Sequence, residues 1–248
     1  MIRFRRVLVV FWWLGLLAVI AVMVQPISLT ITRLAVAAGI FGLWASALFL
    51  TWKFRGLFWM LLLAGLLPGI FLLLPGREID KRRLRDFYVG NLRKYEGARY
   101  VWGGENRRGI DCSGLVRRAL INANLETGLM TLNPELVRAA ISMIWRDRSA
   151  LVLRDGADGL TKRVGEGSSI NAVMQDFIVS PGTLAVTENG VHVLACVGKE
   201  DWIQAAPGEG KVVTLGVPSE NSWYHVPVVL LEWTQLSDPR SPALIDMR

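Results

Sequence analysis

The chain has 248 residues, 52% of them hydrophobic, and a formal net charge of +7 at neutral pH. Its first 76 residues hold six basic and no acidic residues, so the positive charge is typical of flanks of membrane spans and not of a nucleic-acid-binding surface. The two cysteines and two histidines show no CxxC or clustered spacing, which excludes a disulfide framework and gives no metal-site motif.

Three uncharged apolar runs occupy the start of the chain, at residues 7–24, 34–52 and 57–74. Each has about 18 residues, enough to cross roughly 27 Å of hydrocarbon as a helix. Three such runs are not a cleavable signal peptide, and buried helices of a soluble core would carry polar faces. We therefore expect residues 1–76 to form a membrane region of two or three transmembrane helices.

The charges around these runs leave the membrane topology open. Basic residues stand near the N-terminus and between the second and third runs (Arg3, Arg5, Arg6, Lys53 and Arg55). Such residues favour the cytoplasm, so three spans would put the domain that follows outside. Against this, a basic cluster at 77–85 follows the third run closely. A re-entrant hairpin at Pro68-Gly69 would leave only two spans and keep the domain inside.

Residues 77–248 have the size of one domain. A charged amphipathic helix is predicted over 79–95, and a Gly-rich loop leads to a helix that begins near residue 112. A second helix is predicted over 133–148, because a proline stands near its start and its apolar residues keep helical spacing. The Gly-, Ser- and charge-rich stretch 154–171 is predicted to be a loop.

After residue 182 the apolar residues recur with a period of two, in five short runs separated by Gly-containing or polar turns (TLAVT, VHVLACVG, WIQAA, KVVTLGV and HVPVVLLEW). Helices followed by an antiparallel meander indicate an α+β domain, with helices packed on one face of a small antiparallel β-sheet.

Cys112 stands in the segment RRGIDCSGLV, directly after Asp111. Aspartate is a good N-cap, so we expect the cysteine in the first turn of a helix, where free N–H groups and a nearby imidazole lower a thiol's pKa and can hold an oxyanion. His192 lies on the predicted second strand, and Gln204 on the next strand can orient its ring. These residues make a candidate cysteine-nucleophile site.

Four segments in order carry a resemblance to a known family: GARYVWGG, DCSGLV, SPGTLAV with NGVHVLACVG, and DWIQAAPGEGKVV. Over roughly residues 88–217 the chain resembles the NlpC-type cell-wall peptidases, a family of papain-like cysteine hydrolases. The resemblance implies that Cys112 is the nucleophile, His192 the general base and then acid, Gln204 the ring-orienting residue, and Tyr100 a hydroxyl near the sulfur.

The resemblance also implies an activity and a location. Family members typically cleave amide bonds in peptidoglycan stem peptides, often between D-glutamate and a diamino acid. The resemblance implies no metal or organic cofactor. The expected partners are thus these peptides and the lipid bilayer, with no nucleic acid. A wall substrate favours an integral protein of a bacterial cytoplasmic membrane with its catalytic domain (77–248) on the extracytoplasmic side.

Two departures from the family pattern stand out. The third catalytic position is most often histidine, whereas this chain has Gln204. The stretch between Cys112 and His192 is longer than usual, and its extra residues, about 126–176, either form a lid or substrate wall or only fill space.

Other interpretations stay open at this level. A papain-like domain at a membrane could be a lipid acyltransferase or thioester hydrolase, or a degenerate, non-catalytic scaffold. Cys196 is expected to be a core residue, although a disulfide with Cys112 would silence the nucleophile. His225 is expected to be structural or exposed.

Overall fold

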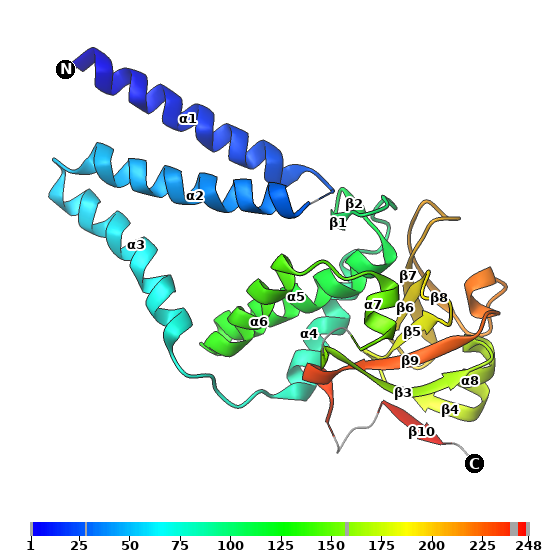
Figure 1. Ribbon diagram of the computed structural model, residues 1–248. Helices are drawn as coiled ribbons and strands as arrows, with labels where there is room; N and C mark the ends of the chain where they lie inside the picture. Colours follow the sequence, from blue (N-terminus) through cyan, green and yellow to red (C-terminus); the bar gives the residue numbers. More distant parts are fainter. Residues whose placement is uncertain (1, 28, 157–158, 239–242, 247–248) are drawn as a thin grey trace.

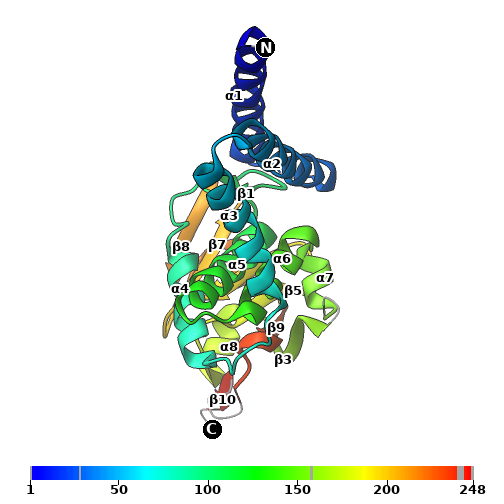
Figure 2. The ribbon, with the colours of Figure 1, turned by 90° about the vertical axis from the view of Figure 1, so that its left-hand side faces the viewer.

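The computed structural model describes residues 2–27, 29–156, 159–238 and 243–246, and it describes no side chains for residues 2–6 and 246. The surroundings of Arg3, Arg5 and Arg6 therefore lie outside the described part. The chain starts with three long apolar helices and continues into a mixed α+β domain (Figures 1 and 2).

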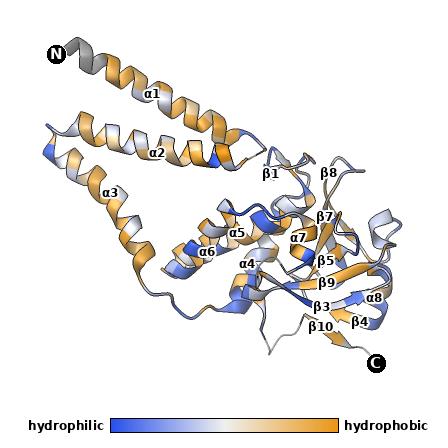
Figure 3. Ribbon diagram, viewed as in Figure 1, coloured by the Kyte–Doolittle hydropathy of each residue, from blue (hydrophilic) through white to orange (hydrophobic). Residues whose placement is uncertain are grey.

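The three apolar helices are α1 (Ile2–Val24), α2 (Thr30–Thr51) and α3 (Arg55–Leu73), and each is long and apolar enough to cross a membrane (Figure 3). Helix α3 runs through Pro68 without a break, so the structure contains no re-entrant hairpin there. Tryptophan side chains join neighbouring helices: the indole N–H of Trp12 donates to the Leu43 carbonyl, and that of Trp44 to the Leu61 carbonyl, both at 2.9 Å.

The connection between α1 and α2 lies beside the α+β domain, and α3 leads back to that domain (Figure 1). The start of α1 and the connection between α2 and α3 lie at the far end (Figure 1). Lys53 belongs to this connection, and Arg55 is the first residue of α3. Both of these basic segments are thus at the end of the helices remote from the domain.

Helices of the domain cover one face of its sheet. The larger ones are α4 (Lys81–Arg93), α5 (Cys112–Met130) and α6 (Pro134–Trp145), close to the predicted ranges. Leu115 and Leu120 of α5 lie in one core with Val186 and Ile203 of the sheet. This arrangement confirms the predicted α+β fold.

The main sheet has six strands in the order β3-β9-β5-β6-β7-β8, and all neighbouring pairs are antiparallel. The strands are β3 (Thr161–Gly167), β5 (Leu184–Thr187), β6 (Val193–Cys196), β7 (Asp201–Ala206), β8 (Lys211–Gly216) and β9 (Val228–Trp233). The predicted meander holds for β5 to β8. It is wrong for β9, because the chain crosses the sheet after β8 and pairs β9 with β5.

The prediction of a loop over 154–171 is also wrong. Strand β3 pairs with β9 along the sheet edge, and its register shifts between Arg163 and Gly165. Lys162, Arg163 and Glu166 are exposed because an edge strand faces solvent, and these charges hid the strand pattern.

Shorter elements lie at the rim of the sheet, on the first face and on the second face. They are β1 (Glu105–Asn106), β2 (Gly109–Ile110), α7 (Ala150–Arg154), α8 (Ile170–Asp176), β4 (Phe177–Val179), η2 (Ser222–Tyr224), η3 (Thr234–Leu236) and β10 (Leu244–Asp246). Trp202 and Tyr224 pack with Cys196 in the core on this second face, whereas Cys112 belongs to the core on the first face. Both cysteines are free, so the structure does not contain the alternative disulfide.

Candidate active site

Cys112 is the first residue of α5, and Asp111 caps the helix as expected. One Asp111 carboxylate oxygen accepts the Gly114 N–H at 2.6 Å and the Ser113 hydroxyl at 3.0 Å, and the other accepts the Gly103 N–H at 2.8 Å. A Cβ at Gly114 would lie 2.3 Å from the Gly104 carbonyl oxygen, so only glycine lets this loop approach the helix start.

His192 and Gln204 form a buried pair: His192 lies directly before β6, and not on the strand as expected, and Gln204 lies on the neighbouring strand β7. The His192 Nε2 and Gln204 Oε1 atoms are 2.7 Å apart, and the two residues are 1% and 0% exposed. Because an amide oxygen only accepts, we assign the proton to Nε2, which leaves Nδ1 as the acceptor. The Trp223 ring stacks on the imidazole with a centroid distance of 4.3 Å.

Three segments meet around the Cys112 sulfur. The main-chain N–H of Val193, the residue after His192, lies close enough to the sulfur to favour the thiolate and lower the thiol pKa. Tyr100, in the loop before β1, is close enough for its hydroxyl to interact electrostatically with Cys112. The start of α5, the start of β6 and the Tyr100 loop therefore bring together the segments that carry the predicted site residues.

The ionisation of the site differs from the expectation. Burial raises the pKa of the Cys112 thiol to about 11, and the Asp111 carboxylate adds to this effect. Burial lowers the pKa of His192 to about 4, and the hydrogen bond that the ring donates to Gln204 opposes this shift. The expected depression of the thiol pKa is thus not found, because Cys112 is only 9% exposed and lies near the Asp111 carboxylate. The resting pair is a neutral thiol and a neutral imidazole.

These pKa values predict how alkylation of Cys112 depends on pH. In a Cys196→Ala background, the rate with iodoacetamide should keep rising with pH toward about 11, since only the thiolate reacts. Asp111→Asn keeps an N-cap side chain but removes the charge, so its curve should shift to lower pH. A wild-type rate that is already constant at pH 6 would contradict the neutral resting state.

Several residues were not foreseen or lie elsewhere. Trp223 was missed because it lies in the short 3-10 helix η2 before β9 and carries no local signal. His225 is exposed and outside the site, as expected. Residues of the longer stretch form α6, α7, β3 and α8, and some of them line a cleft of about 640 Å³ that includes none of the four predicted site residues. Within the described residues, no group of three His, Cys, Asp or Glu side chains could hold a metal.

Comparison with known proteins gives a family and a set of structural neighbours. The profile of the NlpC/P60 family matches residues 97–232, a range that contains all four predicted site residues and excludes α1 to α4. None of the curated proteins compared with the chain matches it.

The structural neighbours include NlpC1 from Trichomonas vaginalis, at 18% identity and a TM-score of 0.40, with 65% of this chain and 48% of that chain covered. The peptidoglycan hydrolase RipB from Mycobacterium tuberculosis is 20% identical, with a TM-score of 0.38 and coverage of 60% and 65%. The NlpC/p60 domain of the peptidoglycan hydrolase SagA is 21% identical, with a TM-score of 0.36 and coverage of 60% and 97%. The chain thus spans about half the length of NlpC1.

Proposed function

The chain belongs to the NlpC/P60 family, and from this premise we propose that it is a membrane-anchored cysteine hydrolase that cleaves amide bonds in peptidoglycan stem peptides. The observation that carries the proposal is the buried His192–Gln204 pair, held at 2.7 Å beside the sulfur-bearing start of α5. A buried imidazole with one nitrogen fixed by an amide oxygen has its other nitrogen free to accept a proton.

In the proposed mechanism, the Cys112 sulfur attacks the amide carbonyl carbon while its proton passes to Nδ1 of His192. This transfer accompanies the attack because both groups are neutral at rest. N–H groups at the start of α5 stabilise the oxyanion, and the Tyr100 hydroxyl interacts electrostatically with Cys112. His192 then protonates the leaving amine, and it takes a proton from the water that hydrolyses the thioester.

A direct assay uses the full chain in lipid nanodiscs with defined muropeptides, and mass spectrometry of the products. We expect one stem-peptide amide to be split into a free acid and a free amine. Intact muropeptides, together with transfer of an acyl group from labelled phospholipid to the protein, would contradict the proposal and favour the acyltransferase alternative. That alternative draws support from the α1–α2 connection, whose Pro26 carbonyl accepts the Glu105 N–H at 2.9 Å, near the nucleophile.

We further propose that residues 1–76 span the membrane three times and that the domain of residues 77–248 is extracytoplasmic in a bacterial cytoplasmic membrane. The basic segments at the far end of the helices favour the cytoplasm. The opposing basic cluster after α3 is partly engaged within the domain: Lys81 donates to the Ser237 carbonyl, and Arg85 pairs with Glu232 at 3.1 Å. The basic cluster therefore favours a cytoplasmic location less strongly than its number of positive charges suggests.

Reporter fusions test this topology. A periplasm-active reporter at the C-terminus should be active, and the same reporter between residues 52 and 55 should be silent. The reverse pattern would place the domain in the cytoplasm, away from the cell wall.

Gln204 gives a specific prediction for the third catalytic position. Gln204→Leu removes the acceptor that fixes the imidazole, so kcat should fall on the order of 10²-fold or more. Gln204→His restores an acceptor for the ring N–H and should keep most of the activity. Equal losses in both variants, measured on the same muropeptide, would show that the amide does not orient His192.

A further inference from the structure

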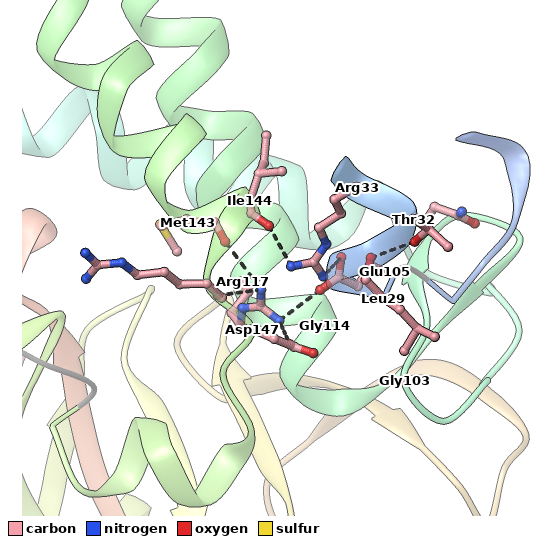
Figure 4. Close-up of polar contacts among 12 residues, drawn as sticks. Leu29, Thr32, Arg33, Gly103, Glu105, Gly114, Arg117, Met143, Ile144 and Asp147 are labelled. Carbon is pink, nitrogen blue, oxygen red and sulfur yellow. Dashed lines mark hydrogen bonds and ion pairs between the residues drawn. The ribbon is translucent and has the colours of Figure 1, made fainter. Parts of the chain in front are cut away.

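A chain of charges with two buried arginines joins a membrane helix to the catalytic domain (Figure 4). Arg33 lies in the first turn of α2 and is 7% exposed, although it sits at the end of a candidate membrane span. Its guanidinium pairs with a Glu105 carboxylate oxygen at 2.9 Å and donates to the Ile144 carbonyl at 2.7 Å. A buried charge is tolerated only when it is paired in this way, so the contacts of Arg33 hold the start of α2 against the domain.

Glu105 is shared between two arginines. Its other carboxylate oxygen pairs with Arg117 of α5 at 3.0 Å, and Arg117 is 3% exposed. Arg117 also pairs with Asp147 at 2.6 Å and donates to the Arg146 carbonyl at 3.0 Å. Glu105 therefore connects the membrane helix to the helix that begins with the nucleophile.

The loop that carries Glu105 also holds the start of α5. Just before Glu105, the Gly103 N–H donates to the Asp111 carboxylate at 2.8 Å, and the carbonyl of the adjacent Gly104 accepts the Asp111 N–H at 3.1 Å. The connection between α1 and α2 lies against the same loop, since Ile27 forms a β-bridge with Gly104. The loop is thus fixed between the membrane hairpin and the residue that caps the nucleophile helix.

We propose that Arg33 is a positioning residue: through Glu105, the membrane hairpin α1–α2 fixes the loop that places Cys112 for attack. The proposal rests on the proposed hydrolase function. Misplacing a reacting group by about 1 Å can cost on the order of 10²-fold in rate, so a side chain that touches no substrate can control turnover.

The test uses the full chain in nanodiscs, with two readouts. Arg33→Gln removes the charge and one arm of the contact, and we expect kcat on muropeptides to fall by roughly 10- to 100-fold with little change in KM. Alkylation of Cys112 by iodoacetamide at pH 8 should become faster. Burial is the main cause of the high thiol pKa, and each unit of decrease raises the thiolate fraction about tenfold.

Arg138 provides the matched control. This exposed arginine of α6 also ties a membrane helix to the domain, since it donates to the Leu72 and Leu74 carbonyls at the end of α3 at 2.7 and 2.8 Å. Arg138→Gln should leave both readouts at the wild-type level. Cys196, which is 0% exposed on the other face of the sheet, should remain unlabelled in both variants.

Arg33→Lys is a second, milder variant that keeps the charge. A single ammonium lacks the planar fork that serves carboxylate and carbonyl together, so we expect an intermediate loss of kcat. Wild-type kcat and wild-type Cys112 alkylation in both Arg33 variants would overturn the proposal. So would equal effects of Arg138→Gln, or labelling of Cys196 in parallel with Cys112, because these outcomes indicate general anchoring or unfolding. Since alkylation needs no substrate, this readout decides the proposal even if wild-type protein leaves muropeptides intact.

Discussion

Cys112→Ala should lower turnover of peptidoglycan peptides by about 10³- to 10⁶-fold, the range seen when a catalytic nucleophile is removed. The substitution deletes the sulfur on which the acyl group is carried, while the N–H groups at the start of α5 remain. The side chain is small and lies at a helix start, so the fold should survive. The measurement is the rate of amide cleavage by the full chain in nanodiscs.

The control for this prediction is Cys196→Ala. Cys196 is buried on the opposite face of the sheet, and its thiol donates to the Gly198 carbonyl at 3.0 Å, away from the predicted site. Its loss should cost some stability and little activity. If the Cys112 variant kept wild-type turnover, or if the two variants lost activity equally, Cys112 would not be the nucleophile.

His192→Ala should have an effect of similar size, on the order of 10³-fold or more, because it removes both the base for the thiol and the acid for the leaving amine. The Cys112→Ala, His192→Ala double variant should be little worse than either single variant, since the two groups act as one unit. Exposed His225 is the matched control, and His225→Ala should keep wild-type turnover.

A multiplicative loss in the double variant would contradict this account, since it would mean that the two residues act independently. Alkylation gives an additional check. The Cys112 thiol pKa is set mainly by burial and by Asp111, so His192→Ala should change its pH dependence little.

Local chemistry made parts of the fold and site predictable. The three apolar helices follow from run length and composition alone, and α5 begins at Cys112 because Asp111 is a good cap. His192 and Gln204 were expected side by side because consecutive antiparallel strands are neighbours in a meander, and β6 and β7 are such a pair.

Other parts depend on tertiary contacts that the sequence does not carry. Strand β3 escaped prediction because its exposed charges resemble a loop, and β9 was misplaced because either edge of the meander could accept it. The high thiol pKa arises from burial, which only the packed structure defines. The N–H groups at a helix start, considered alone, predict a lowered thiol pKa.

Arg33 illustrates the same limit. In the sequence it stands between two apolar runs, where a basic residue is expected to flank a membrane span. The structure instead buries it against Glu105, which lies 72 positions later in the chain. Two residues of the long stretch after residue 126 lie in the same cluster: the Ile144 carbonyl accepts from Arg33, and Asp147 pairs with Arg117, so part of that stretch contacts α2.

The most direct test of the central claim is a single-turnover reaction quenched in acid, with the mass of the protein and of its peptides measured at successive times. Covalent catalysis by Cys112 predicts a thioester adduct of the stem-peptide acyl group on the peptide that contains this cysteine. The adduct should form as the amine product is released and decay as the acid product is released. It should be absent in His192→Ala. Amide cleavage at the wild-type rate with no adduct on Cys112 at any time would contradict it.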